Sequence, residues 1–124
     1  MSGKILVVDD TADTRELFHL SLTRAGYAVI EAADGREGVF RAKTDKPDVI
    51  ITDIMMPDMD GYALIGAIRG APEIAATPII ALTAYGAEKL KLAKEVGANE
   101  ARSKPMNLGE LVNLVGRMLD VTKP

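Results

Sequence analysis

Five side chains in this sequence have the chemistry of a phosphate site; four of them stand at the ends of three apolar runs, and the fifth comes farther along the chain. Three carboxylates, a hydroxyl and an ammonium make up the set: Asp9, Asp10, Asp53, Thr83 and Lys104. Continuous runs of Val, Ile and Leu, such as the one before Asp9, are typical of strands buried on both faces of a parallel sheet. The ligand of such a sheet lies beyond the carboxyl ends of its strands. We therefore expect the five side chains to converge in one small cleft.

The three carboxylates indicate a divalent cation. Asp9 and Asp10 follow the first apolar run and Asp53 follows the third, so they meet if these two strands are neighbours. Carboxylates that close repel one another, and at least one proton or a cation should be present. Oxygen ligands favour Mg²⁺, which takes only one or two carboxylates directly. The alternative is that Asp9 and Asp10 cap the following helix, whose N-terminus favours negative charge.

Asp53 is the best candidate for a nucleophile. A carboxylate can accept a phosphoryl group and form an acyl phosphate. The transferring group spreads charge over its equatorial oxygens, so the neighbours must supply positive charge and hydrogen-bond donors. Mg²⁺, the Lys104 ammonium and the Thr83 hydroxyl with nearby backbone N–H groups would meet that need. Each has a simpler reading, Thr83 as a β-branched strand residue and Lys104 as a solvated charge, but the complete set favours a phosphoryl site.

Strand and helix patterns alternate along the chain. The strand patterns cover 4–8, 27–31, 48–52, 78–82 and, more weakly, 100–103, and the helix patterns cover 12–25, 35–45, 62–70, 86–96 and 107–120. Turn residues separate them: Gly26, Asp34-Gly35, Asp60-Gly61 and Gly97. Alternating β and α units predict parallel strands joined by right-handed crossovers. We expect a three-layer α/β sandwich with a five-stranded sheet.

The composition fits one domain and excludes several classes of protein. The chain has 124 residues, of which 48% are hydrophobic and 27% charged, as in ordinary globular proteins. A net charge of −3 gives no reason to expect nucleic acid as a partner. The absence of Cys excludes disulfides and thiolate metal sites. Without a signal-peptide pattern or an apolar run of membrane-spanning length, we expect a cytoplasmic protein without a membrane partner.

The chain resembles, end to end, a response-regulator receiver domain of the single-domain, CheY-like type. The matching stretches are Lys4–Asp10, Asp48–Gly61, Pro78–Ala84, Gly97–Asn99 and Ser103–Pro105, and their order and spacing are highly specific. The resemblance implies a doubly wound, flavodoxin-like sheet with strand order 2-1-3-4-5 and five helices. It also implies one receiver domain over residues 1–124 with no output domain, although a segment of a longer protein would read identically.

The resemblance also assigns roles in two-component signal transduction. Asp53 would accept the phosphoryl group from a histidine of a histidine kinase or a histidine phosphotransfer protein. Asp10 would bind Mg²⁺ directly and Asp9 mostly through water, with Asp53 and the Met55 backbone carbonyl as further ligands. The domain would catalyse only its own phosphorylation and dephosphorylation and would not otherwise be an enzyme. His19 is not the phosphodonor, and we expect it as an exposed surface residue.

By the same resemblance, the phosphorylated site would change the face made by the fourth helix, fifth strand and fifth helix. Lys104 would contact the phosphoryl group and Thr83 would move to hydrogen-bond it. This face would bind a downstream protein that the sequence does not identify, or the phosphoryl group would pass onward in a phosphorelay. We expect a monomer or weak dimer. Val112, Leu114 and Leu119 either border this face for a partner or belong to a wide buried face.

The chain departs from the family pattern in the residues that accompany switching. Ala101 stands where relatives usually have Tyr or Phe, and we hypothesise that Tyr85 takes over part of the aromatic role. The resemblance implies that Met55 and Tyr85 flank the path of the attacking water, and neither can orient it; the alternative is that both merely pack over the loop. We therefore predict slow hydrolysis of the phosphorylated form. The bond before Pro105 is often cis in relatives.

Three other interpretations compete with a receiver. A flavodoxin-like cofactor binder would want a neutral or Gly-rich loop after the first strand, where Asp9-Asp10 would repel a phosphate. A haloacid-dehalogenase-type phosphatase with an aspartyl nucleophile would have Asp-x-Asp there, a spacing that Asp9-Asp10-Thr11 lacks. A pseudo-receiver acting as a scaffold is the third alternative, and the complete set of five site residues argues against it.

Overall fold

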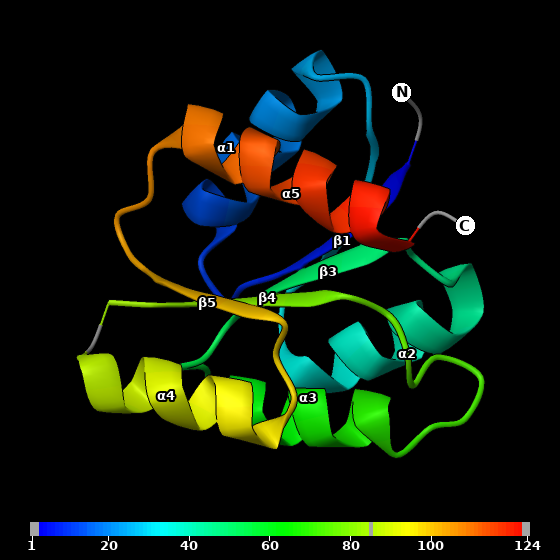
Figure 1. Cartoon of the computed structure of the whole chain (residues 1–124), viewed down its shortest axis with the longest axis vertical. Helices are drawn as coiled ribbons and strands as arrows, with labels where there is room; N and C mark the ends of the chain where they lie inside the picture. The colour runs from blue at the N-terminus through cyan, green and yellow to red at the C-terminus, as the bar shows by residue number, and fades with distance from the viewer. Residues whose placement is uncertain (1–2, 85, 123–124) are drawn as a thin grey trace.

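The computed structural model describes residues 3–84 and 86–122, and strands alternate with helices throughout (Figure 1). The strands are β1 (Lys4–Val8), β2 (Ala28–Ala32), β3 (Val49–Asp53), β4 (Ile79–Thr83) and β5 (Glu100–Ser103). The helices are α1 (Ala12–Arg24), α2 (Gly35–Asp45), α3 (Gly61–Arg69), α4 (Ala87–Val96) and α5 (Leu108–Thr122). All strand pairs are parallel, in the order β2-β1-β3-β4-β5. The predicted fold class and strand order are confirmed.

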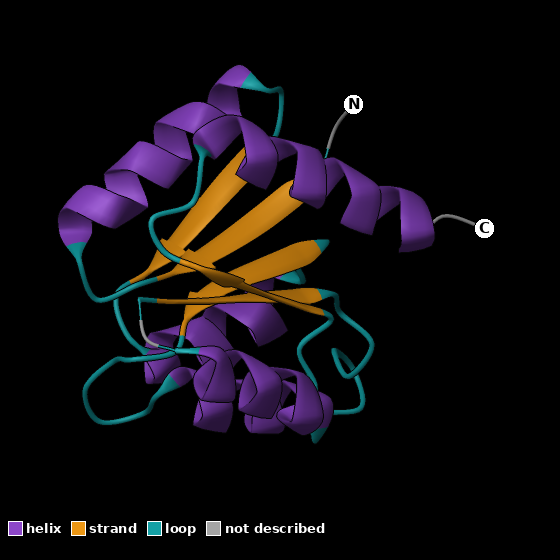
Figure 2. Ribbon diagram, turned by 60° about the vertical axis from the view of Figure 1, so that its left-hand side comes forward, coloured by secondary structure: helices purple, strands orange, loops and turns teal. Residues whose placement is uncertain are grey.

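The sheet is covered by helices on both faces (Figure 2), which explains why its strands are continuously apolar. Ile5 and Val7 of β1 belong to the core under α1 and α5, whereas Leu6 and Val8 belong to the core under α2, α3 and α4. All four side chains are at most 1% exposed. Because successive side chains alternate between faces, one strand supports both cores and its end is fixed from both sides.

Two side-chain caps begin the helices that follow β2 and β3, at the predicted positions. The Asp34 carboxylate accepts a hydrogen bond from the Glu37 backbone N–H at 2.8 Å, and Glu37 accepts one from the Ala33 N–H at 2.7 Å. This reciprocal pair satisfies two donors at the start of α2. Asp60 caps α3 by accepting from the Ala63 N–H at 2.9 Å. These caps fix the loops that lie beside the carboxyl end of the sheet.

The strands β2, β3 and β4 each lie one residue later than the sequence pattern predicts. Asp53 and Thr83 are therefore the last residues of strands rather than the residues that follow them. The reason is pairing with neighbours, since Asp53 lies opposite Leu82 and Thr83 opposite Ser103. Both site residues are thus held in the sheet ladder.

The last helix presents a wide buried face. Leu114 is 2% exposed and Leu119 is 6% exposed, and Val112 is partly buried against the same core. The structure therefore supports the wide-face alternative for Leu114 and Leu119 and leaves them no role at an exposed partner surface.

The edge strand β5 is more polar than the other strands. Glu100 and Arg102 form an ion pair at 2.7 Å, and Ala101 is half-buried opposite Ala81 of β4. In the described part of the chain, no helix combines the length and apolar character needed to cross a membrane.

Candidate functional site

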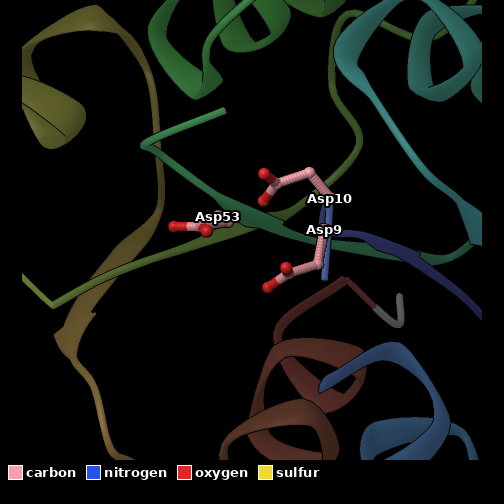
Figure 3. A group of neighbouring side chains, drawn as sticks. All are labelled: Asp9, Asp10 and Asp53. Atoms are coloured by element: carbon pink, nitrogen blue, oxygen red, sulfur yellow. The ribbon is translucent and has the colours of Figure 1, made fainter. Parts of the chain in front are cut away.

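The carboxyl ends of β1 and β3 bring the three predicted carboxylates together. Asp9 and Asp10 directly follow β1, and Asp53 ends the neighbouring strand β3. Figure 3 shows the side chains of Asp9 and Asp10 extending from the end of β1 to the same side as Asp53. One carboxylate oxygen from each residue lies within 4.8 Å of the others. Asp10 and Asp53 are 43 positions apart in the sequence, yet they belong to one acidic cluster.

Lys104 joins this cluster from the end of β5. Its Nζ lies 2.9 Å from Asp9 Oδ2 and 3.3 Å from Asp53 Oδ2. Its backbone N–H donates to the Thr83 carbonyl at 2.8 Å, which fixes where the side chain begins, and the Lys104–Pro105 peptide is cis. The ammonium therefore bridges the predicted acceptor and one predicted metal-binding residue.

Asp9 and Asp10 differ in their surroundings, and neither is the N-cap of α1. Asp9 is only 2% exposed, and its Oδ1 accepts a hydrogen bond from the Thr11 N–H at 2.8 Å. Thr11 occupies the N-cap position. Asp10 is exposed and forms no hydrogen bond or ion pair with the described residues. Asp9 thus orders the loop before the helix, and the Asp10 carboxylate can bind a cation.

The Asp53 side chain is largely buried, with 11% of it exposed. Its Oδ1 accepts a hydrogen bond from the Met55 N–H at 3.3 Å, while Oδ2 faces Lys104. The first turn of α3 lies directly on its backbone, since the Gly61 N–H donates to the Ile54 carbonyl at 2.8 Å. A Cβ atom at Gly61 would lie 2.5 Å from the Asp53 carbonyl oxygen. The sequence showed Gly61 only as a helix start, and this close approach was missed.

Burial and charge act against each other on the two central groups. Burial raises the pKa of the Asp53 carboxyl, the Lys104 ammonium opposes that rise, and the Asp9 carboxylate adds to it, with a raised pKa as the result. Burial alone would lower the pKa of Lys104, but its hydrogen bond to Asp9 and the charges of Asp9 and Asp53 outweigh that effect and raise it. Lys104 therefore stays protonated at neutral pH.

The donor set fits a magnesium ion. Asp9, Asp10 and Asp53 supply only oxygen atoms, the ligand type that hard divalent cations prefer. Lys104 offsets only part of the negative charge of three carboxylates. A divalent cation held by Asp10 and Asp53 would balance the remainder without displacing the ammonium.

Comparison with known proteins decides the family. The model of the response regulator receiver domain matches residues 5–116. The chain belongs to this family. The receiver domain is 38% identical to the alkaline phosphatase synthesis transcriptional regulatory protein PhoP of Bacillus subtilis, over 100% of this chain and 52% of PhoP. It thus spans about half the length of that relative.

Solved structures agree with this receiver fold. The chemotaxis protein CheY4 of Vibrio cholerae matches with a TM-score of 0.89 and 38% identity, over 96% of this chain and 100% of that one. The receiver domain of the Francisella response regulator 1452 matches with a TM-score of 0.90 and 30% identity, over 98% and 99%. The family and its homologues place this chain in two-component signalling, and neither the pseudo-receiver scaffold nor the aspartyl-nucleophile phosphatase is favoured.

An apolar cavity of about 370 Å³ adjoins the receiver site and was not predicted. Its lining comes from α1, from the loop after β4, from the loop between β5 and α5 and from the start of α5: Thr14, Leu17, Phe18, Ala84, Lys104, Pro105, Met106 and Leu108. Leu17 and Leu20 on α1 are 49% and 51% exposed. The cavity is lined by Lys104, which contacts Asp53, so apolar surface lies next to a residue that contacts the predicted acceptor.

A polar network on the other side of Asp9 was also missed. The Arg15 guanidinium contacts Asp9 and Glu31, and the ring of His19 contacts Glu31 at 2.8 Å. We expected His19 to be an exposed surface residue. Its side chain is 41% exposed, but its ring is also paired with Glu31 of β2. The pattern at Arg15 and His19, four residues apart on a helix, was the available signal.

Tyr85, which we expected to share the aromatic role, lies outside the described residues. Thr83 is 1% exposed at the end of β4, beside the cluster. Met55 is 44% exposed at the same end of the sheet. The placement of Thr83 and Met55 agrees with their predicted roles, which stay predictions.

Proposed function

We propose that this receiver accepts a phosphoryl group on Asp53 from a phosphohistidine of a histidine kinase or histidine phosphotransfer protein. The observation that carries the proposal is the position of the Asp53 carboxylate, which contacts the Lys104 ammonium and has an oxygen within 4.8 Å of carboxylate oxygens of Asp9 and Asp10. Its buried side chain has one oxygen on Lys104 and the other on a backbone N–H.

In the proposed transfer, an Asp53 carboxylate oxygen attacks the phosphorus atom and the bond from phosphorus to the donor histidine nitrogen breaks. The electron pair of that bond returns to the imidazole, which takes up a proton from solvent. Charge accumulates on the phosphoryl oxygens during transfer, and fixed positive groups lower the barrier. Mg²⁺, when bound by Asp10, Asp53, the Met55 carbonyl and, through water, Asp9, supplies part of this positive charge.

Lys104 supplies the remaining positive charge and links the site to the rest of the fold. In the unphosphorylated protein its ammonium is shared by Asp9 and Asp53. New phosphoryl oxygens would compete for it and for the Thr83 hydroxyl, and the backbone bond between Lys104 and Thr83 couples the loops after β4 and β5. We propose that this shift alters the face of α4, β5 and α5 for a downstream protein or for onward phosphorelay. With Ala101 in β5, backbone movement would carry the change.

The donor would approach over the apolar cavity beside Lys104. Lys104 lines this cavity and also contacts Asp53, so a side chain that fills the cavity would touch a residue in contact with the acceptor. The exposed Leu17 and Leu20 suit the apolar side of a helix that bears the donor histidine. We propose a monomer or weak dimer in the cytoplasm, with no nucleic acid or membrane as its direct partner, and one receiver domain over residues 1–124.

Beyond its own phosphorylation and dephosphorylation, we propose no turnover of other substrates. Met55 is exposed beside the acceptor and has no group that could orient an attacking water. The half-life of phospho-Asp53 should therefore exceed that of the Met55→Asn, Tyr85→Glu double variant. A half-life no longer than that of the variant would contradict slow hydrolysis and leave the acceptor role unaffected.

Incubation with acetyl phosphate and Mg²⁺, followed by intact-mass measurement, tests the acceptor directly. We expect one phosphoryl group on the wild-type chain and none on Asp53→Asn. Asp58→Asn is the matched control, because Asp58 is an exposed carboxylate in the loop that follows the acceptor. Equal labelling of wild type and Asp53→Asn, or no labelling of wild type, would overturn the proposal.

A further inference from the structure

We infer that Arg15 is a positioning residue for the metal-binding loop, supported by Glu31 and His19; the inference rests on the proposed function. Arg15 lies in the first turns of α1, and 18% of its side chain is exposed. Its Nη1 donates to the Asp9 backbone carbonyl at 2.6 Å, and its Nε donates to Glu31 Oε1 at 3.3 Å. The guanidinium therefore connects β2 to the peptide that joins Asp9 to Asp10.

Both oxygens of Glu31 are engaged, which fixes the position of Arg15. Oε1 accepts from Arg15, and Oε2 lies 2.8 Å from His19 Nδ1. Arg15 and His19 are four residues apart on α1 and share one face of it. Glu31 extends from β2, next to Val7 of β1. A planar guanidinium with one edge on a fixed carboxylate has little freedom to move away from the Asp9 carbonyl.

Every hydrogen-bonding group of Asp9 has a partner, and Arg15 is the partner of its backbone carbonyl, which belongs to the peptide that leads to Asp10. The Asp9 N–H donates to the Ala32 carbonyl at 3.1 Å, and its carboxylate oxygens contact the Thr11 N–H and Lys104. The carbonyl that Arg15 holds belongs to the peptide plane between Asp9 and Asp10. Because a peptide is planar, fixing its oxygen also fixes the direction in which Asp10 leaves that plane.

Asp10 itself depends on this indirect support. Its carboxylate has no hydrogen bond or ion pair within residues 3–84 and 86–122, so only the backbone holds it near Asp53. Groups that orient metal ligands from outside typically change metal affinity by about 10- to 100-fold when they are removed. The Arg15 contact holds the peptide before Asp10, and the bond from the Thr11 N–H to Asp9 holds the peptide after it, so Arg15 would help to set the Asp10 ligand in place.

The sign of the effect separates positioning from simple electrostatics. Removing a positive charge beside an acidic cluster should strengthen Mg²⁺ binding if charge alone matters. Loss of positioning should weaken it. If Arg15 served only to attach α1 to β2, Arg15→Ala and Glu31→Ala would lower stability to a similar extent and would not weaken Mg²⁺ binding.

The experiment is calorimetric titration of the full chain with Mg²⁺ at a temperature where each variant is folded. We expect Arg15→Ala to weaken Mg²⁺ binding about tenfold. Arg15→Lys should recover part of the affinity, because an ammonium can reach the Asp9 carbonyl or Glu31 but lacks the fork that serves both. Arg36→Ala, which removes an exposed arginine from α2, controls for net charge and should leave the affinity unchanged.

Unchanged or tighter Mg²⁺ binding by Arg15→Ala would overturn the inference. If Arg15→Ala does not fold, Arg15→Lys and Glu31→Gln decide, and wild-type affinity in both would overturn it equally. The acceptor proposal has a separate readout in labelling by acetyl phosphate. If acetyl phosphate labels the wild-type chain but Arg15→Ala binds Mg²⁺ as tightly as wild type, only the inference about Arg15 is rejected. If Arg15→Ala binds Mg²⁺ more weakly but the wild-type chain is not labelled, only the proposal that Asp53 is the acceptor is rejected.

Discussion

Two cations at opposite ends of the sheet, Lys104 and Arg69, have contrasting surroundings. Lys104 lies at the carboxyl end between two carboxylates, Asp9 and Asp53. Arg69 ends α3 and reaches the loops that precede β4 and β5. Within the described residues, its guanidinium donates to neutral oxygens alone, at 2.7 to 3.0 Å: the carbonyls of Ala75, Thr77 and Gly97 and the side-chain amide of Asn99.

The pKa values of the two cations are displaced in opposite directions. Burial lowers the pKa of Arg69, and Arg69 forms no ion pair with a carboxylate of the described residues. Burial also acts to lower the pKa of Lys104, but Asp9 and Asp53 raise it overall. Neutral partners hold Arg69 in an arrangement that does not depend on any change of charge. Under the proposed function, metal binding and phosphorylation would change the charge around the partners of Lys104. This end of the sheet would then respond while the other end stays fixed.

The largest expected effect is on the rate of phosphorylation. Lys104→Met should slow labelling by acetyl phosphate about 100-fold, because a fixed positive group at the transferring oxygens is lost. Intact-mass time courses at saturating Mg²⁺ measure this rate. Lys94→Met, at an exposed lysine of α4, should label like wild type. If Lys104→Met is labelled at the wild-type rate, Lys104 does not assist phosphoryl transfer, and the proposed difference between Lys104 and Arg69 is wrong.

At the other end, Arg69→Met should act on stability instead. Its acceptors would lose a donor that ties α3 to two loops, and the free energy of unfolding should fall by about 2–3 kcal/mol. Urea unfolding measures the loss, and the folded fraction should label with acetyl phosphate at the wild-type rate. Slower labelling of fully folded Arg69→Met would show that the amino end of the sheet also takes part in the chemistry.

A smaller effect of opposite sign is expected at the acceptor. Asp53→Asn should raise the free energy of unfolding of the metal-free protein, since the raised pKa means that the folded site favours a neutral group there. Thermal unfolding in EDTA measures the change. Added Mg²⁺ should stabilise wild type more than Asp53→Asn. A lower melting temperature for the variant in EDTA would contradict this expectation.

The smallest effect is the pH dependence that follows from the same shift. The raised pKa of Asp53 contributes stability that is fully present below the ordinary carboxyl pKa and is lost as the pH rises through the folded-state value. The raised pKa of Lys104 contributes stability at neutral pH that is lost only as the pH rises above its ordinary value of 10.5. Unfolding in EDTA across the acidic range should therefore change less steeply with pH for Asp53→Asn. Identical profiles would contradict the shift at Asp53.

The backbone of the site was predictable from sequence, whereas the contacts of its long side chains were not. Apolar runs indicated the strands, Asp34 and Asp60 indicated helix starts, and parallel strands place their carboxyl ends at one edge. The ion pair between Lys104 and Asp9 joins residues 95 positions apart, and no local pattern marks it. The contacts of Arg69 could not be predicted either, because its acceptors are mostly backbone carbonyls, which every residue has and no sequence pattern marks.

Strand ends were misplaced for a related reason. Asp53 and Thr83 are polar, so the apolar pattern stops before them, although backbone pairing continues through both. Side-chain periodicity reports which face a residue occupies, and it says nothing about where a backbone ladder ends. The two residues most important to the proposed chemistry are therefore the ones that the pattern left outside their strands.

The contact between Gly61 and the Asp53 backbone has a consequence for tolerated sequence variation. Any side chain at Gly61 would begin 2.5 Å from the Asp53 carbonyl oxygen and 2.7 Å from the Ile54 Cα, and neither atom belongs to a flexible side chain. Gly66 has open space around it on the same helix. In a saturation-mutagenesis library selected for signalling output, codon 61 should therefore accept glycine alone, while codon 66 should accept many residues.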